Sequence, residues 1–132
     1  SLVEYAIYNN ADEGTIRYLL NKGVKPVIGK GIEWLISFAY MRNLKIGHNL
    51  LKKYIDVVNP NEIVTSSSIT FAQIIANRGT YDDFKLLITK KNVDTRHIDG
   101  NDRGMLDFAV LNKHTKEALK ISKYLVDVTG VD

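Results

Sequence analysis

A short run of hydrophobic residues with one polar position recurs four times along the chain. The copies lie at residues 3–7, 36–40, 72–76 and 106–110, and in each the second residue is polar. Their fourth residues fall at positions 6, 39, 75 and 109, so the copies are separated by 33, 36 and 34 residues. A period of this size is typical of repeat proteins, in which each unit packs on its neighbours.

A second hydrophobic element follows each copy, and it is a pair of bulky aliphatic residues near the end of a helical stretch. A short polar break precedes each pair, and a longer polar stretch with turn residues follows it. The four pairs are Leu19 with Leu20, Leu50 with Leu51, Leu87 with Ile88, and Leu125 with Val126. The pattern of each unit therefore predicts a helix, a tight turn, a second helix and a loop. We predict one all-α domain over residues 1–132, with units near 1–30, 31–66, 67–101 and 102–132.

The starts of several helices carry capping signals. Ser1 with Glu4, and Thr70 with Gln73, have the spacing of a capping box, in which two side chains satisfy unpaired backbone donors. The other N-caps that we expect are Asp12 and Thr115.

Residues at the breaks suit helix ends, because Gly and Asn best tolerate a left-handed conformation. We expect that conformation at Asn10, Asn43 and Gly79, and a stop after the first unit's second helix at Gly23.

The first helices also carry predictions about the core. A small residue recurs in each, which allows close approach between neighbouring helices: Ala6, Ala39, Ala76 and Ala109. One position of each unit holds an aromatic or aliphatic residue that we predict to pack between neighbouring units: Tyr5, Phe38, Ile74 and Phe108. Trp34 is predicted to be a buried anchor.

The third unit resembles the ankyrin repeat. Residues 70–79 (TFAQIIANRG) and 84–88 (FKLLI) align without a gap to the family pattern T-P-L-H-x-A-A-x-x-G and its V-x-L-L-L stretch. Residues 18–23 resemble the family's L-L-L-x-x-G, and residues 106–110 resemble L-H-x-A-A, although the family's proline after threonine is absent throughout. The resemblance covers nearly the whole chain and implies an ankyrin-type helical-repeat solenoid. Tetratricopeptide units of about 34 residues rank second, because they lack the long polar loops.

Composition narrows the class of protein. Hydrophobic residues make up 45% and charged residues 25%, which is ordinary for a globular domain, and the net charge of +3 is small. The chain has no cysteine, which excludes disulfides and thiolate-based zinc sites and fits an intracellular, cytoplasmic protein. Apolar runs are far shorter than the roughly 18–20 residues of a membrane span, so we expect no membrane partner.

The first and last units resemble interior repeats, because they lack the polar outer face of a terminal repeat. We therefore expect the chain to be a piece of a longer protein.

Catalytic chemistry is not indicated by the polar residues. His48, His97 and His114 are widely separated, and the pair Asp82 and Asp83 suits a helix start, where carboxylates favour the helix dipole. The acidic stretch 94–102 reads as a turn, because it lacks the spacing of a calcium loop. We therefore expect a protein that is not an enzyme, without metal, cofactor or small-molecule substrate.

The resemblance implies that another protein binds the exposed residues after the first helices and the loop tips. Carried over by position, the candidate partner-binding residues are Tyr8, Asn9, Met41, Arg42, Asn77, Arg78, Leu111 and Asn112, with Arg96 and His97 on a loop. Tyr, Arg and Met are enriched at interfaces. The competing interpretation is that these side chains pack on adjacent helices.

Two other functions remain open at this point. One is nucleic-acid binding through the lysines of the second helices, which the small net charge disfavours. The other is a targeting module of a larger, effector-type enzyme. Heavy use of Asn, Ile, Lys and Tyr suggests an AT-rich genome, such as that of an intracellular bacterium or large virus, which would place the protein in a host cytoplasm.

Overall fold

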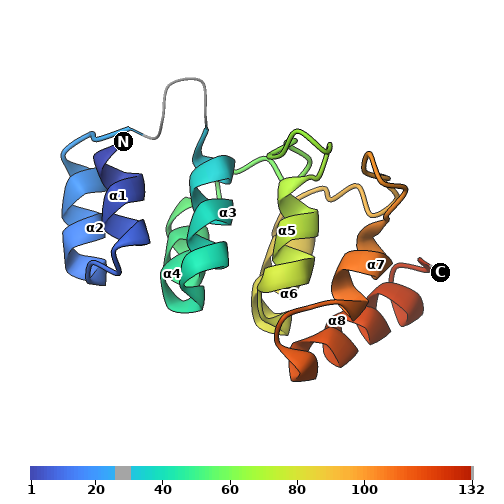
Figure 1. Cartoon of the computed structure of the whole chain (residues 1–132). Helices are drawn as coiled ribbons and strands as arrows, with labels where there is room; N and C mark the ends of the chain where they lie inside the picture. Colours follow the sequence, from blue (N-terminus) through green and yellow to red (C-terminus); the bar gives the residue numbers. More distant parts are fainter. Residues whose placement is uncertain (26–30, 132) are drawn as a thin grey trace.

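The computed structural model describes residues 1–25 and 31–131, and α-helices form the framework of this part of the chain (Figure 1). The prediction of an all-α protein is confirmed for these residues, whose one β feature is an isolated bridge between Ile63 and Thr70. The helices of the described residues are α1 (Leu2–Tyr8), α2 (Glu13–Asn21), α3 (Ile32–Arg42), α4 (Leu44–Tyr54), α5 (Phe71–Arg78), α6 (Tyr81–Lys90), α7 (Met105–Val110) and α8 (Thr115–Asp127).

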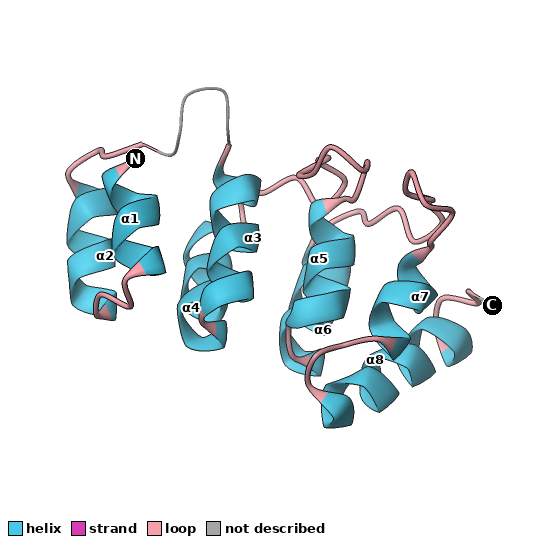
Figure 2. Ribbon diagram, in the orientation of Figure 1, coloured by secondary structure: helices cyan, strands magenta, loops and turns pink. Residues whose placement is uncertain are grey.

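The helices pair in chain order as four hairpins. The first helices α1, α3, α5 and α7 pack on one another in sequence, and α6 packs on α8. Figure 1 shows that the first helices point the same way, so their C-terminal ends lie on one side of the molecule. The longer loops before α5 and α7 lie on the opposite side, as the loop colouring of Figure 2 makes clear. Among the described helices, none is long and apolar enough to cross a membrane.

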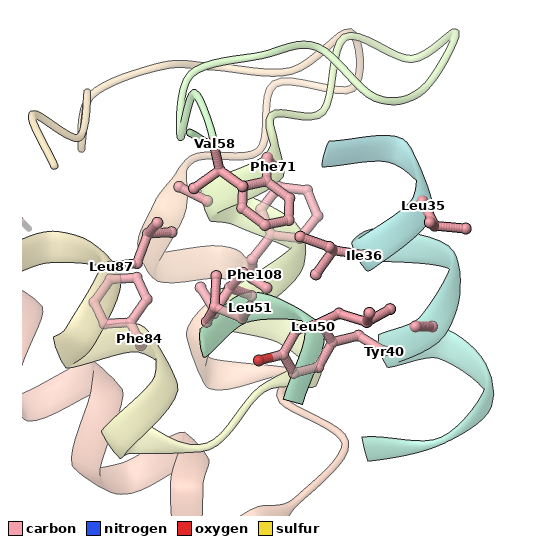
Figure 3. Close-up of a cluster of buried hydrophobic side chains, with 14 of the residues drawn as sticks. Leu35, Ile36, Tyr40, Leu50, Leu51, Val58, Phe71, Phe84, Leu87 and Phe108 are labelled. Carbon is pink, nitrogen blue, oxygen red and sulfur yellow. The ribbon is translucent and has the colours of Figure 1, made fainter. Parts of the chain in front are cut away.

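A continuous core joins the hairpins. Ala39, Ala76 and Ala109 have no exposed surface, which confirms the predicted close approach of the first helices. Figure 3 shows buried side chains of several helices meeting in one cluster. The larger members include Leu35, Leu51, Phe71, Phe84 and Phe108.

The predicted burial of one apolar residue per unit between neighbouring units is only partly confirmed. Ile74 and Phe108 are buried and Phe38 is half-buried, but Tyr5 is 68% exposed, so its prediction as core was wrong. Trp34 is half-buried rather than buried, and its ring stacks on that of Phe38 at a centroid distance of 5.6 Å. The first two units therefore leave aromatic rings at the surface of α1 and α3.

Several predicted helix boundaries are confirmed. The Asp12 carboxylate caps α2 by accepting from the Thr15 backbone N–H at 2.7 Å. Thr70 and Gln73 form the predicted capping box of α5. Asn10 and Gly23 have φ values of 58° and 85°, which are the left-handed conformations expected of them.

Other boundary predictions were wrong. The Ser1 hydroxyl donates to the Glu4 carboxylate and does not cap α1, and Thr115 is the first residue of α8, whose N-cap is His114. Asn43 is extended, with a φ of −156°, because its side chain caps the start of α4. Gly79 is also extended rather than left-handed, with a φ of −91° and a ψ of 177°. A Cβ atom there would lie 2.9 Å from the Ile75 carbonyl oxygen, so close backbone approach explains this glycine.

Gly47 sets the distance between α3 and α4. A Cβ atom at this position would lie 2.6 to 2.9 Å from three ring atoms of Tyr40, closer than atoms in van der Waals contact. The Tyr40 ring is itself buried and its hydroxyl is bonded to Asp83 on α6, so the ring has little room to move. The missing side chain therefore lets the second and third units meet through Tyr40.

We predict that Gly47→Ala destabilises the protein by about 1–3 kcal/mol, because an added methyl group overpacks a filled interior. Urea denaturation followed by circular dichroism measures the change. Gly14→Ala, at an exposed position in α2, is the matched control and is expected to leave stability unchanged or raise it by up to about 1 kcal/mol, because alanine favours a helix more than glycine does. Equal effects of the two substitutions would contradict the role of Gly47.

Candidate functional site

The ends of the first helices present exposed apolar side chains. Tyr8, Met41 and Leu111 are 56%, 48% and 69% exposed, which confirms the exposure predicted for them. Each stands within one residue of the C-terminal end of α1, α3 or α7. Because these helices point the same way, the three residues lie on one side of the molecule, which we call the first-helix edge (Figure 1).

Tyr8 and Arg42 meet across the first two units. The Arg42 guanidinium carbon lies 4.2 Å from the centroid of the Tyr8 ring, within the range of a cation–π contact. The contact arises because both residues end neighbouring helices that run in the same direction. Both side chains are exposed, so the contact contributes about 0.5–1 kcal/mol. It holds an aromatic ring and a cation together at the edge, next to Met41.

The asparagines at the same edge have a different role from the one predicted. The Asn112 side-chain amide donates to the carbonyl oxygens of Ala76 (2.7 Å) and Gly79 (3.0 Å). In return, the Asn77 amide donates to the carbonyl oxygens of Phe108 (3.0 Å) and Leu111 (3.2 Å). These bonds tie the third unit to the fourth.

Asn112 is only 5% exposed, so its prediction as an exposed binding residue was wrong. Its amide is buried because the last carbonyl groups of a helix need donors. Asn77 is half-buried and its oxygen accepts from the Arg78 Nε atom at 3.1 Å. Asn9 is exposed as predicted, and its amide donates to the Tyr5 carbonyl oxygen within its own unit.

Arg96 and His97 lie on the loop between α6 and α7, on the opposite side of the molecule from the first-helix edge (Figure 1). Arg96 is exposed. His97 is half-buried, and its Nε2 atom lies 2.7 Å from the Ser68 carbonyl oxygen, which joins two loops. The buried Gln73 amide donates to the His97 carbonyl oxygen at 2.9 Å. The predicted residues thus form two separate groups.

A buried polar cluster that the sequence pattern does not predict lies between the second and third units. Asp83 is 1% exposed, and its two carboxylate oxygens contact the Tyr40 hydroxyl (2.8 Å) and the His48 Nδ1 atom. From the sequence, Asp83 is interpreted as a carboxylate that favours the helix dipole, and no role is predicted for His48. A signal was present, since Tyr40 occupies a position that is Ile7, Ala76 and Val110 in the other units. A buried tyrosine hydroxyl needs a partner.

The electrostatics of this cluster favour a structural role. Burial, and then the neighbouring Asp83 carboxylate, raise the pKa of the Tyr40 hydroxyl far above its ordinary value of 10.0. Tyr40 therefore remains a proton donor, and its reactive oxygen is enclosed. Both oxygens of Asp83 are already engaged, so the cluster links α3, α4 and α6.

The acidic stretch before α7 is a turn, as predicted. The Asp99 carboxylate accepts from the backbone N–H groups of Asn101 (2.9 Å) and Arg103 (2.8 Å) and from the Arg103 side chain (3.0 Å). Burial disfavours the ionised carboxylate, but the hydrogen bonds and the charge of Arg103 outweigh it, so the pKa of Asp99 lies below its ordinary value of 3.8. Within residues 1–25 and 31–131, no three His, Asp or Glu side chains are grouped as metal ligands.

Comparison with known proteins gives no relative from which a role could be transferred: no family model, curated protein or solved structure matches the chain.

We predict that Tyr40→Phe lowers the free energy of unfolding by about 1–3 kcal/mol, because the buried Asp83 carboxylate loses a donor. Urea denaturation measures the change. Tyr18→Phe removes a hydroxyl from an exposed ring and is expected to have an effect below about 0.5 kcal/mol. If Tyr40→Phe is as mild as this control, the cluster does not stabilise the junction.

We predict that Asp99 contributes to stability in a pH-dependent way. Its pKa is lowered on folding, so the stabilisation is complete above about pH 5 and is lost as the pH falls through 3.8 and below. Asp99→Asn should therefore destabilise the protein at neutral pH and flatten the acid limb of its stability curve. Thermal unfolding between pH 7 and pH 3 tests this, with the exposed Asp102→Asn as control. An unchanged acid limb would contradict the assignment.

Proposed function

We propose that the chain is an ankyrin-type repeat module that binds another protein. The sequence period, the four hairpins and the small buried residues of the first helices all support this architecture. In such an array each unit depends on its neighbours for burial, and the residues outside these contacts are left to recognise a partner.

The exposed side chains of the first-helix edge carry the proposal. Tyr8, Met41 and Leu111 are apolar and largely exposed, although the core beneath them is already filled. Arg42 is held against Tyr8, which adds a charged group with five potential donors. Aromatic residues, methionine and arginine are the types most enriched at protein interfaces.

The proposed surface is smaller than the set of residues predicted from sequence. It comprises Tyr8, Met41, Arg42, Leu111 and the half-buried Arg78. The asparagines of the edge act as scaffold, because their amides bind backbone carbonyl groups. The loop bearing Arg96 and His97 offers a second contact region for a partner that reaches around the array.

The state of the reactive groups supports a role in binding rather than catalysis. The Tyr40 hydroxyl and the Asp83 carboxylate are buried and bonded to each other. The His97 ring bonds a loop carbonyl group. These side chains stabilise junctions, whereas the exposed edge is dominated by groups suited to recognition.

We predict that the triple variant Tyr8→Ala, Met41→Ala, Leu111→Ala loses its partners in affinity capture from cell extract. Hot-spot residues contribute at least about 2 kcal/mol each, so recovery should fall more than tenfold. A matched control replaces three exposed apolar residues elsewhere, Tyr18, Val57 and Val126, with alanine.

Circular dichroism of both triple variants establishes that each is folded. Loss of the same proteins from both variants would show that general hydrophobicity, and not the first-helix edge, governs capture. If the captured material is nucleic acid and its recovery falls steeply with salt, the alternative based on the second-helix lysines is correct instead.

A further inference from the structure

A groove runs between the second helices of the first two units, away from the proposed protein-binding edge. Its volume is about 310 Å³, at the lower end of the range for small-molecule sites. Its floor consists of four aliphatic side chains, Ile16 and Leu20 from α2 and Ile46 and Leu50 from α4. We call it the α2–α4 groove.

The lining of the α2–α4 groove differs from that of the hollow beside α6 and α8, where aromatic rings stand. Between α6 and α8, the Tyr124 ring meets those of Tyr81 and Phe84 edge-on, with centroids 6.1 and 6.4 Å apart. Tyr81 is the first residue of α6, and Phe84 follows three positions later. Tyr81 and Tyr124 also line a hollow of about 320 Å³ beside these two helices.

The corresponding positions of the first two units hold smaller or polar side chains. Glu13 is the first residue of α2, as Tyr81 is of α6, and Ile16 stands where α6 has Phe84. Asn49 precedes the bulky pair of α4, as Tyr124 precedes that of α8. Three rings are thus replaced by a carboxylate, an aliphatic chain and an amide, all of which line the α2–α4 groove.

Charge around the groove is uneven. Three cations line it, Arg17, Lys52 and Lys53, against one carboxylate, that of Glu13. Glu13 is paired with Arg17 near the start of α2. Lys52 and Lys53 lie at the far end of α4, where the Lys53 Nζ atom donates to the Asn21 Oδ1 atom at 2.8 Å. One end therefore attracts an anion, and the other carries the carboxylate that would repel it.

The length of the groove limits the size of an occupant. From Glu13 to Leu20, and from Ile46 to Lys53, each wall spans eight residues and therefore seven helical steps. At 1.5 Å per residue this is about 10 Å. An extended chain advances roughly 1.2 Å per bond, so about eight or nine bonds fill the groove.

We propose that the α2–α4 groove binds a single-chain alkyl carboxylate of about ten carbon atoms. The alkyl chain lies on the floor formed by Ile16, Leu20, Ile46 and Leu50. The carboxylate lies at the end bearing Lys52 and Lys53, away from Glu13. This site is separate from the first-helix edge, and the two can be tested independently.

A chain-length series tests the proposal directly. The whole chain is titrated with hexanoate, octanoate, decanoate and dodecanoate by isothermal calorimetry, below the concentrations at which these compounds form micelles. Affinity should rise roughly two- to fourfold for each added CH₂ group while the chain is being buried. It should level off near ten carbons, where the groove is full. A continued rise at the same slope would indicate non-specific adsorption and overturn the proposal.

Matched probes and variants separate the roles of shape and charge. Decyltrimethylammonium, with the same chain and opposite charge, should bind at least tenfold more weakly than decanoate. Asn49→Tyr places a ring where α8 has Tyr124, and it should abolish decanoate binding while the helical circular dichroism signal is retained. Leu119→Tyr adds a ring at an exposed position on α8 and should leave binding unchanged.

The double variant Lys52→Gln, Lys53→Gln should weaken decanoate binding about tenfold and leave the dependence on chain length intact. Equal binding of the cationic and anionic probes, or decanoate binding that survives Asn49→Tyr, would overturn the assignment. Neither result would bear on the triple variant of the first-helix edge, so failure here is distinguishable from failure of the proposed protein-binding role.

Discussion

Helix length is the constraint on which this architecture depends. The described helices have between 6 and 13 residues, and isolated helices shorter than about 12–15 residues are marginal in water. Each hairpin must therefore bury its apolar faces on a neighbour, which requires the backbones to come close. Ala39, Ala76 and Ala109 are fully buried for this reason. Gly47 serves the same purpose within the second unit, where the Tyr40 ring takes the place of its missing side chain.

Close packing creates a second requirement, because helix ends carry carbonyl groups without partners. The reciprocal amide bonds of Asn77 and Asn112 satisfy such groups on α5 and α7 and join the third unit to the fourth. Between the second and third units, the buried Asp83 carboxylate makes the link through Tyr40 and His48. The small-residue contacts are repeated along the array, whereas the polar links differ from one junction to the next.

This difference explains which parts of the structure could be predicted from the sequence. The period placed the first helices, and the caps at Asp12 and Thr70 were found because each bonds a residue three positions away. The burial of Asn112 was missed, since its carbonyl partners lie 36 and 33 residues earlier in the chain. Tyr40 and Asp83 are 43 residues apart.

Sequence pattern also placed the exposed residues of the first-helix edge but not the contact between them. Positions after each small residue indicated that Tyr8 and Arg42 would be exposed, yet their 4.2 Å contact depends on the angle between neighbouring helices. The α2–α4 groove could not be predicted for a similar reason. Its existence depends on the space left between two helices, which the residues of either helix alone do not determine.

Junction positions outside the repeated contacts differ from one part of the array to another. The same three positions hold Tyr81, Phe84 and Tyr124 where α6 meets α8, and a carboxylate, an aliphatic chain and an amide where α2 faces α4. One junction is lined by aromatic rings and the other by smaller or polar side chains, while the buried alanines of the first helices are common to both. The residues that hold the units together and those that distinguish one junction from another are therefore different sets. A substitution at such a junction position need not weaken the packing on which the short helices depend.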